Sequence, residues 1–595
     1  MSRIPRALSM KNLPATALLI ALVLGLVLGL GAPGRAQDFE RIAPRPPAAG
    51  EGGQLLDASD SAGLADPASE EAAVELLPRL RGLVFVPRPA DVRPEGRPDV
   101  TGVLVEGVPL MDPAEWSARL AERIGAPLSL GGLHQILREV IAYYRAEGRP
   151  VVDVVVLEQD ITGGVIQLAV VEARLGDIRA EGAKWFRPER LTAQVRLEPG
   201  HPIDSTLLMA DLAWLNRNPF RSVDLLYTPG RDEGETDLVL RVDDRFPLRA
   251  YVGGEDSGNL LTGRNRWLAG INYGNLWGRD HQINYQWTFN DRLERLDAHA
   301  LSYIAPLPWR HQLALHAAYV QSQADLPPPF DLDGETAQLS GRYTLPLPGR
   351  PGLEHELEFG YDFKHSTSQL EFGVLTALAT ATDVQQFVAG YRARLKDESG
   401  LSSLAAFGYF SPGDLGGGNE DAAFALARAG ADSEYQYGRV DLERAQRLPR
   451  GFSAYLRASG QVADGNLLPS EQLGLGGHAS VRGYEEHELN VDRGYLLSAE
   501  QRLPPVPLPA PPFLAEGQAG ELQLLVFVDR GGGRSVDRLP GEPESYSMSS
   551  VGPGLRWTVG ERFHLRFDYG FQLEDSGAGL AQGDSRAHLG MMLAW

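Results

Sequence analysis

A single arginine beside a glycine is the feature of this sequence that most suggests specific side-chain chemistry. Arg482 lies in the motif Val481-Arg482-Gly483-Tyr484, which follows two glycines and precedes three glutamates. A guanidinium can form a bidentate ion pair with a carboxylate, and such a pair offsets the cost of removing the cation from water. Gly483 allows a sharp turn, and Tyr484 adds an amphipathic ring that can pack against a wall. The residue types alone leave two interpretations open, a solvated surface loop and an anchored one.

Catalytic chemistry finds little support in the same sequence. The chain has no cysteine, which excludes disulfide frameworks, thiolate metal sites and cysteine nucleophiles. The 12 histidines form no His-Glu-x-x-His motif, and there is no Gly-x-Ser-x-Gly elbow and no phosphate-binding glycine loop with its lysine. We therefore expect no enzyme activity, no cofactor and no metal.

Length and charge narrow the class of protein further. With 595 residues the chain is too long for one ordinary core, so two or more domains are expected. The formal net charge of −22 argues against nucleic acid as a partner, because phosphate binding needs a basic face. The 67 glycines, 19 tyrosines, 20 phenylalanines and 9 tryptophans suit a large β structure.

The N-terminus has the pattern of an export signal. Basic residues precede an apolar run over 15–32, and small residues then suit cleavage after residue 36. A retained membrane helix is the alternative, since the run is just long enough to span a bilayer. Residues 37–80, rich in Pro, Ala, Gly and acidic residues, predict a linker. Within it, 66–77 predicts a short helix, which could act as a plug or be merely solvated.

Two small α/β units follow the linker. Over 81–175, strand-like and amphipathic helical runs give the order β-α-α-β-β, with the helices in 113–125 and 131–148. The same order recurs over 176–246, which indicates two small domains in series. Such mixed sheets leave an edge that can receive an extended peptide by strand addition.

From residue 247 to 595 the helical period disappears and strict alternation takes its place. In 281–290 and 563–573, apolar and aromatic residues alternate with polar and charged ones. The simplest account is a transmembrane β-barrel with an apolar face toward lipid and a polar face toward a wet lumen. The length predicts about 16 antiparallel strands. Proline-rich turns recur at strand ends and fit short connections on one side of the barrel.

The C-terminus also fits a barrel. Leu589, Met591, Leu593 and Trp595 share the outward face of an alternating strand. A terminal aromatic residue on such a strand resembles the closing-strand signal of outer-membrane barrels.

Several motifs in one order resemble a known family. These are LEQDITGGVIQLAVVEARLG in the first unit, LNRNPFRSVDLLYTPGRDEGETDLVLRVDD in the second, and GGEDSGNLLTGRNRW, NYGNLWGRD, LGLGGHASVRGY and VFVDRG in the barrel. Over about residues 80–595 the chain resembles the TpsB-type outer-membrane transporters of two-partner secretion, the haemolysin/haemagglutinin secretion family of the POTRA-plus-barrel superfamily. The linker and its helix match that family poorly.

The resemblance implies a function and a location. A transporter of this family would lie in the outer membrane of a Gram-negative bacterium, surrounded by lipid, with its two POTRA domains in the periplasm. The POTRA domains would bind the N-terminal secretion domain of a partner exoprotein, and the barrel would export that partner unfolded. We expect a monomer. An outer-membrane assembly insertase of the same superfamily is the nearest alternative, and a passive porin or receptor would lack the paired domains.

The resemblance also implies a role for Arg482. In this family the loop that carries the motif folds back into the lumen, and its arginine pairs with an inward acid of the barrel wall. Asp529 is the first candidate, because it lies on the opposite face of its strand from the apolar residues Leu524 and Val526. Asp492 is the second candidate.

Overall fold

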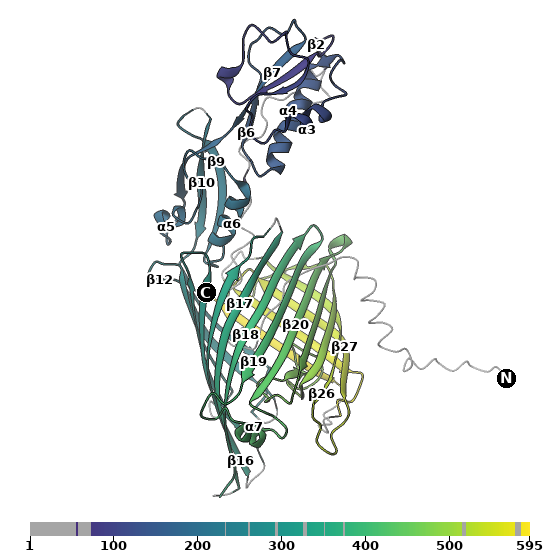
Figure 1. Ribbon diagram of the computed structural model, residues 1–595. Coiled ribbons are helices and arrows are strands. Elements are labelled where there is room, and N and C mark those ends of the chain that lie inside the picture. Colours follow the sequence, from purple (N-terminus) through teal and green to yellow (C-terminus); the bar gives the residue numbers. More distant parts are fainter. Residues whose placement is uncertain are drawn as a thin grey trace, which may run out of the picture. The chain divides into compact units, whose positions relative to one another are not determined.

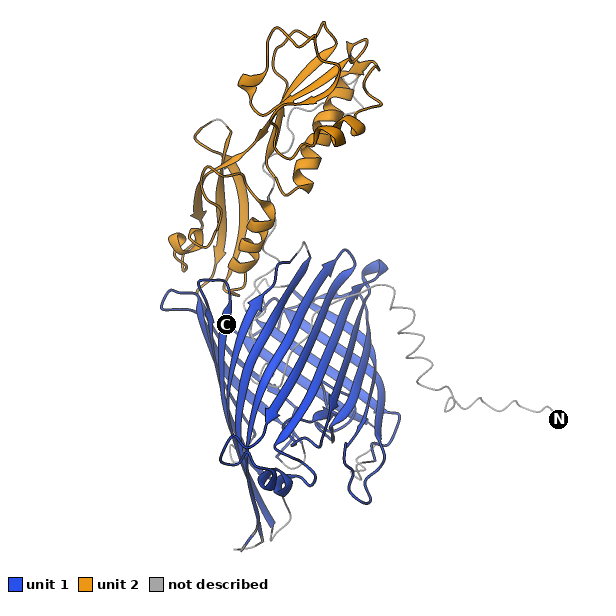
Figure 2. Ribbon diagram, viewed as in Figure 1, with its two compact units in different colours: residues 1–47, 247–595 blue, residues 48–246 orange. Residues whose placement is uncertain are grey.

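The computed structural model describes residues 55–56 and 73–595, apart from gaps at 233, 260–261, 292–294, 325, 327–329, 350–351, 373–374, 515–518 and 578–584. The chain divides into two compact units, one formed by 1–47 with 247–595 and the other by 48–246 (Figure 2). The expected signal peptide, 1–36, lies outside the described residues, as does most of the expected linker. No helix in the described part of the chain is long and apolar enough to cross a membrane.

The first α/β unit is a four-stranded sheet with two helices packed against it. Asp112 and Ser129 cap the helices by accepting hydrogen bonds from Glu115 N and Gly132 N, and the aromatic ring of Tyr144 is fully buried under the sheet. The sheet order is β4-β3-β7-β6. The elements are β3 (Gly82–Val86), η3 (Pro89–Asp91), β4 (Gly102–Val105), α3 (Pro113–Arg119), β5 (Leu128–Ser129), α4 (Leu130–Ala146), β6 (Val152–Val155) and β7 (Val165–Glu172).

The strand β3 was missed by sequence reasoning, which began this unit's sheet with the strand near residue 100. All five residues of β3 are buried, because the strand lies between β4 and β7 with both faces covered. A strand of this kind is a short continuous apolar run without alternation, so periodicity does not reveal it.

The second unit follows the predicted β-α-α-β-β order. Its helix α6 begins after the capping Asp204 and buries Leu208, Leu212 and Leu215 against the sheet. The sheet order is β1-β9-β10-β8, and β1 adds in parallel to the edge of β9. The elements are β1 (Leu55–Leu56), β8 (Arg174–Glu181), α5 (Pro188–Thr192), α6 (Ser205–Leu215), β9 (Arg221–Pro229) and β10 (Glu235–Asp244).

The expected helix over 66–77 is wrong in its last residues. Its first part, 66–72, lies outside the described residues, but Glu75–Leu77 form the strand β2, which pairs with β5. The side chains of Leu77 and Leu80 are buried in the core of the first unit. Packing of these leucines against the sheet overrides the local helical pattern, and the unit begins before residue 81.

The rest of the chain closes into an antiparallel barrel (Figure 1). β24 and β25 (Val506–Pro509) pair with successive parts of β26, so the barrel has 16 strands, as predicted. These strands are β11 (Leu248–Glu255), β12 (Arg266–Leu276), β13 (His281–Phe289), β14 (Leu296–Pro306), β15 (Gln312–Ala324), β16 (Phe330–Pro346), β17 (Leu353–Phe372), β18 (Leu375–Asp397), β19 (Gly400–Pro412), β20 (Glu434–Arg447), β21 (Ser453–Ala463), β24 (Arg493–Arg502), β26 (Ala519–Arg534), β27 (Tyr546–Val559), β28 (Phe563–Gln572) and β29 (Ser585–Ala594).

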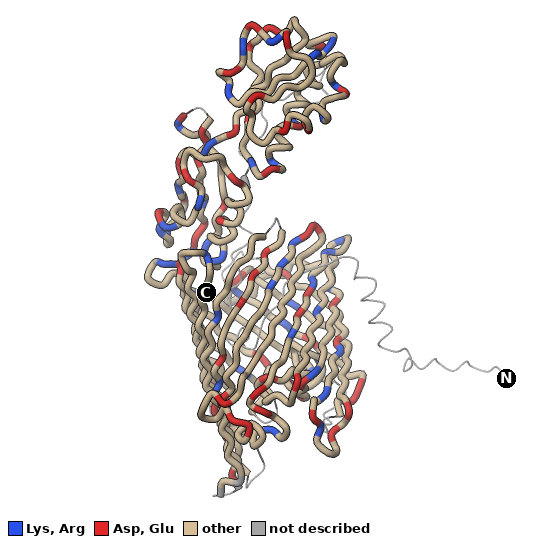
Figure 3. Tube along the Cα trace, in the orientation of Figure 1, with Lys and Arg blue, Asp and Glu red and all other residues tan. Residues whose placement is uncertain are grey.

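The two faces of the barrel wall differ as the alternation predicts. In β26, Leu524 and Val526 are about half exposed, whereas Phe527 and Asp529 are buried on the inner face. Figure 3 shows that much of the barrel trace is uncharged. An apolar outer surface with a polar inner one suits lipid outside and water or protein inside.

The two ends of the barrel also differ. The proline turns over 307–311, 347–349 and 503–505 lie at the end where the barrel chain begins and ends, as the sequence predicts. The opposite end carries longer connections, including 413–433 with the helix α7 (Asp421–Ala427) and the connection 464–492 (Figure 1). The 3-10 turn η4 (Pro449–Gly451) lies with the proline turns, at the end where the barrel chain begins and ends.

Candidate functional site

The connection 464–492 carries the Val-Arg-Gly-Tyr motif into the barrel. Within it, β22 (Leu473–Leu475) and β23 (Leu489–Val491) pair as a short antiparallel stem. Stem residues pack with Val481 and Tyr484 in one apolar cluster, which also contains Met548 of the barrel wall. Because both the stem and the tip are buried, the loop 476–488 (the motif loop) is a packed part of the barrel and not a solvated one.

The structure brings Arg482 and Asp529 together. The Nε and Nη2 atoms of Arg482 donate to the two carboxylate oxygens of Asp529 over 2.7 and 2.8 Å, which is the bidentate geometry of a strong ion pair. The backbone N–H of Arg482 donates to the same carboxylate over 3.1 Å. The guanidinium also lies 3.6 Å from the centre of the Phe527 ring. Arg482 is 4% exposed and Asp529 0%, so the pair is buried.

Two further acids, which the sequence did not single out, share the same arginine. Arg482 Nη1 lies 2.7 Å from Glu500 on β24 and 3.4 Å from Asp568 on β28. Arg502 lies 2.6 Å from Glu500, and Arg556 lies 2.9 Å from Asp568. Three arginines therefore face three carboxylates, and the cluster is neutral overall. The alternation of side chains along β28 predicts that Asp568 lies on the inner face of the barrel. It does not predict that Asp568 lies beside Arg482.

The net effect on Arg482 is to favour its charged form. Burial by itself lowers the pKa of the guanidinium, but Asp529 and the two neighbouring acids outweigh burial and raise the pKa above its ordinary value. The side chain is thus a permanent cation whose position depends on carboxylates from three wall strands.

The rest of the motif fixes the tip against the neighbouring wall strands β27, β28 and β29. Gly483 has a φ of 96°, and a Cβ there would lie 2.9 Å from the carbonyl oxygen of Gly570 on β28. The N–H of Gly483 donates to His588 Nε2 over 3.0 Å, and its carbonyl accepts from Gln572 over 2.6 Å. The hydroxyl of Tyr484 donates to the carbonyl of Ser549 on β27 and to that of Glu574 in the β28–β29 connection. Only glycine satisfies both the left-handed φ and the close backbone approach.

A second ionic contact holds the downstream side of the motif loop. Glu485 pairs with Arg264, in the β11–β12 connection, and with Arg586 on β29. The strands β11 and β29 meet at the seam that closes the barrel, where the register spans only Tyr251–Glu255 of β11. Glu485 therefore joins the loop to both sides of this seam.

Asp492 is buried but does not contact Arg482. Its two carboxylate oxygens accept from Arg428 over 2.5 and 2.8 Å. The N–H groups of Leu467 and Val536 and the side chain of Gln472 donate to it as well. Asp492 thus ties together three connections at the α7 end of the barrel.

The same end is closed further by a buried acid. Glu471 binds Lys364 of β17 over 2.7 Å and Tyr437 of β20 over 2.8 Å. Burial raises the pKa of the Glu471 carboxyl, but Lys364 and hydrogen bonds from Tyr437 and Ser470 outweigh burial and hold the pKa below its ordinary value. The ring of Phe424, on α7, is fully buried beside these groups. The connections therefore fill this end of the lumen.

The four C-terminal residues singled out by the sequence lie at the closing seam. Leu589, Met591 and Trp595 are exposed on the outer face and Leu593 is half-buried. The backbone of Trp595 exchanges two hydrogen bonds with Ala250 of β11, at 2.9 and 3.3 Å.

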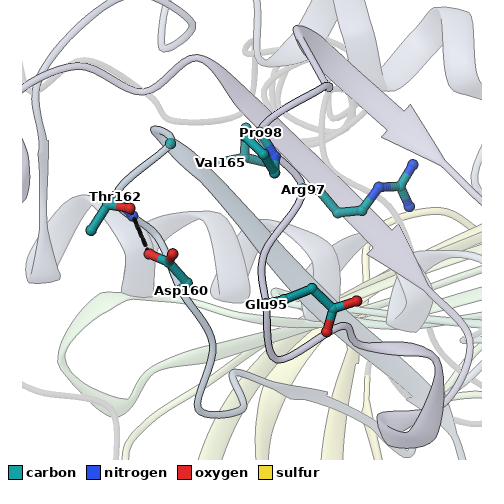
Figure 4. A pocket seen from close by; sticks show the side chains of 7 residues that line it. Glu95, Arg97, Pro98, Asp160, Thr162 and Val165 are labelled. Carbon is teal, nitrogen blue, oxygen red and sulfur yellow. Dashed lines mark hydrogen bonds between the residues drawn. The ribbon is translucent and has the colours of Figure 1, made fainter.

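One small recess lies in the first α/β unit (Figure 4). It is lined by Glu95, Arg97 and Pro98 on one side and Asp160 and Thr162 on the other. Thr162 donates its N–H and hydroxyl to Asp160, and these bonds lower the pKa of that carboxyl. Arg97 is paired with Glu106 at 3.2 Å. The charged side chains Arg97 and Asp160 of the recess are thus engaged within the unit, and the described residues contain no group of His, Asp and Glu that could hold a metal ion.

Comparisons with known proteins identify the family. Residues 234–556, more than half of the chain, match the haemolysin secretion/activation protein family ShlB/FhaC/HecB. Residues 99–173 match the ShlB-type POTRA domain. This match identifies the chain as a secretion transporter and not as the outer-membrane assembly insertase that was the nearest alternative.

Individual relatives agree with this family. The heme/hemopexin transporter protein HuxB of Haemophilus influenzae is 22% identical over 460 residues, which are 74% of this chain and 77% of HuxB. The outer membrane transporter CdiB of Escherichia coli is 26% identical over 67% of this chain and 68% of its own. Two solved structures of CdiB, each 18% identical to this chain, share the fold. The structure from E. coli has a TM-score of 0.68 and aligns over 89% of this chain and 93% of its own. The structure from Acinetobacter baumannii has a TM-score of 0.58 and aligns over 99% of this chain and 100% of its own. This chain belongs to the ShlB/FhaC/HecB family and is an outer-membrane transporter of two-partner secretion, with its POTRA domains in the periplasm.

Proposed function

We propose that the transporter binds one secreted partner protein through its POTRA domains and passes it, unfolded, through the barrel lumen as the motif loop leaves the wall. The partner would be recognised by its N-terminal secretion domain. We propose further that the transporter acts as a monomer in lipid and that it catalyses no reaction. The domain limits are those given above, with the first POTRA domain starting at about residue 73.

The observation that carries the proposal is the way the motif loop is held. The loop occupies the lumen, and Arg482 and Gly483 hold its tip to the wall through ion pairs and hydrogen bonds, beside the apolar contact of Val481 and Tyr484 with Met548. Polar contacts can be exchanged for water when the loop moves, whereas an apolar plug would expose its surface to water. The lumen can thus be closed at rest and can open for a chain in transit.

The POTRA domains are the proposed receptor because their sheets have accessible edges. The short strand β1 adds to the edge of β9 in this structure, which supports that edge as a place where an extended segment can pair. Affinity should be modest, since binding a mobile peptide also orders it.

Secretion of the partner encoded next to this gene tests the proposal. Cells that express both proteins should release the partner, and deletion of residues 73–246 should abolish release while an inserted barrel remains. The isolated segment 73–246 should bind unfolded partner with a Kd on the order of 10 µM. Undiminished release after the deletion, with no binding by the segment, would overturn the receptor role.

A further inference from the structure

Three neighbouring strands, β16, β17 and β18, are longer than the rest of the barrel strands and run past them at the α7 end. β18 has 23 residues and β17 has 20, whereas β19, the next strand, has 13. A tilted strand needs only about 9–11 residues to cross a bilayer. The distal parts of β16, β17 and β18 therefore form a small sheet beyond the membrane, visible at the tip that carries the β16 label in Figure 1.

The last strand of this sheet has a free edge. β18 pairs with β17 along its length, but its pairing with β19 begins only at Phe387. The N–H of Asp383 still bonds Gly418 in the β19–β20 connection, which shows that odd-numbered residues of β18 point toward this side. Ala379 and Ala381 follow the same register, and no described residue bonds their backbone groups.

The segment 378–381 of this edge lacks two of the usual protections against pairing, charged residues and prolines. Natural edge strands carry charged residues, prolines or bulges that prevent a further strand from adding. Residues 378–381 of β18 read Leu-Ala-Thr-Ala, with no charge and no proline, and the β-bulge of this strand precedes them, between Thr376 and Leu378. The charges of this sheet lie on its inner strands instead, for example Asp333 and Glu335 on β16. This is the reverse of the arrangement that would keep a second strand away.

The edge is also continuous with the lumen. Further along β18, Gln386 lies on the inner face and binds Asp362 and Glu471, which closes the lumen at this end. A chain that leaves the lumen along β18 meets the free edge next. We propose that the edge of β18 at residues 378–381 is a strand-addition site for the exported partner, whose first emerging segment pairs there in extended conformation. The proposal rests on the proposed export function.

Disulfide mapping tests the site, because the chain has no cysteine of its own. A partner stalled in transit by a folded C-terminal fusion would carry single cysteines at successive positions, and the transporter would carry Ala381→Cys. Neighbouring strands bring paired residues close enough for a disulfide, and side chains alternate between faces. We expect cross-links at every second partner position. Leu539→Cys, exposed in the β26–β27 connection at the same end, is the control and should show no such period.

A cysteine inside the barrel separates this proposal from export itself. Gln338→Cys, on the inner face of β16, should cross-link to the stalled partner wherever export takes place. Cross-links at 338 without a two-residue period at 381 would overturn the strand-addition site and leave export standing. Absence of cross-links at 338 would overturn export and the site with it. A disulfide between two transporters at 381 would assign the edge to a second copy.

A backbone substitution provides a second measurement. Ala381→Pro removes an N–H that points to the free edge and leaves the ladder with β17 intact, whereas Ala381→Ser keeps the N–H. We expect the proline variant to insert normally but to slow, by about threefold to tenfold, the appearance of protease-resistant partner at the surface, as the loss of one or two hydrogen bonds predicts. Equal rates for the proline and serine variants would contradict the proposal.

Discussion

Arg482→Ala removes the cation that joins the motif loop to three wall strands. The substitution leaves Asp529, which is 0% exposed, without its bidentate partner. Asp529 keeps two donors, the hydroxyl of Ser498 at 2.6 Å and the backbone N–H of residue 482. Glu500 and Asp568 keep Arg502 and Arg556. The electrostatic loss therefore falls mainly on one carboxylate.

This geometry sets the magnitude. Removal of one partner of a buried ion pair costs about 3 to 5 kcal/mol, and the donors left on Asp529 favour the lower value. A loss of about 3 kcal/mol shifts the docked position of the loop against the undocked one by about 100-fold. The strand ladder does not depend on this contact, so the barrel should still fold and insert. A loop that has lost its anchor would stay in the lumen and obstruct the chain in transit, so we expect secretion per inserted transporter to fall to a small fraction of the wild-type level.

The assay is surface partner per inserted transporter, with insertion measured by heat-modifiable mobility in gels. Arg482→Lys keeps the charge but not the fork, so it should fall between alanine and wild type. Asp529→Ala should give a similar defect, and the double variant should lose less than the sum of the two, because both remove one contact. Near-normal secretion by Arg482→Ala would refute the anchoring of the loop, and additive losses would remove Asp529 as the partner that matters.

Three other predictions use different parts of the barrel. Gly483→Ala should disable secretion as strongly as the arginine change, because its Cβ would meet Gly570, whereas Gly541→Ala, with a φ of 97° and open space around it, should be nearly silent in the same assay. Asp492→Asn should weaken the closure by Arg428 by about 3 kcal/mol and raise single-channel conductance in planar bilayers, and a conductance equal to wild type would show that other contacts close this end. Residues 247–595 alone should fold in detergent with β-dominated circular dichroism and heat-modifiable mobility, and solubility without detergent would exclude a membrane barrel.

The barrel and the POTRA domains could be predicted from the sequence because their signals are local. The side-chain period changes near residue 247 from helical to strict alternation, and that alternation fixes which face of each strand is apolar. Strand number followed from length alone. The sequence did not predict the buried strand β3 or the strand Glu75–Leu77. The burial of β3 and the pairing of Glu75–Leu77 with β5 depend on residues distant in the chain, so the local pattern does not indicate either strand.

The site was predictable only in part. Alternation put Asp529 and Asp568 on the inner face, and the glycine of the motif indicated a tight turn. Which acids meet Arg482 depends on strand order and register, since Glu500, Asp529 and Asp568 come from strands that are up to 68 residues apart in the chain.

The pairing of Asp492 with Arg428 illustrates the same limit. The sequence offered two acids for one arginine, and both are buried. Only the folded connections at the α7 end bring Arg428 within 2.5 Å of Asp492 and leave Asp529 to Arg482. The sequence by itself determined the kinds of side chain, their faces and the elements that carry them, because these depend on residues a few positions apart. The tertiary structure decided the ion pairs, because a charge in the lumen is stabilised by whichever opposite charges barrel closure brings within a few ångströms.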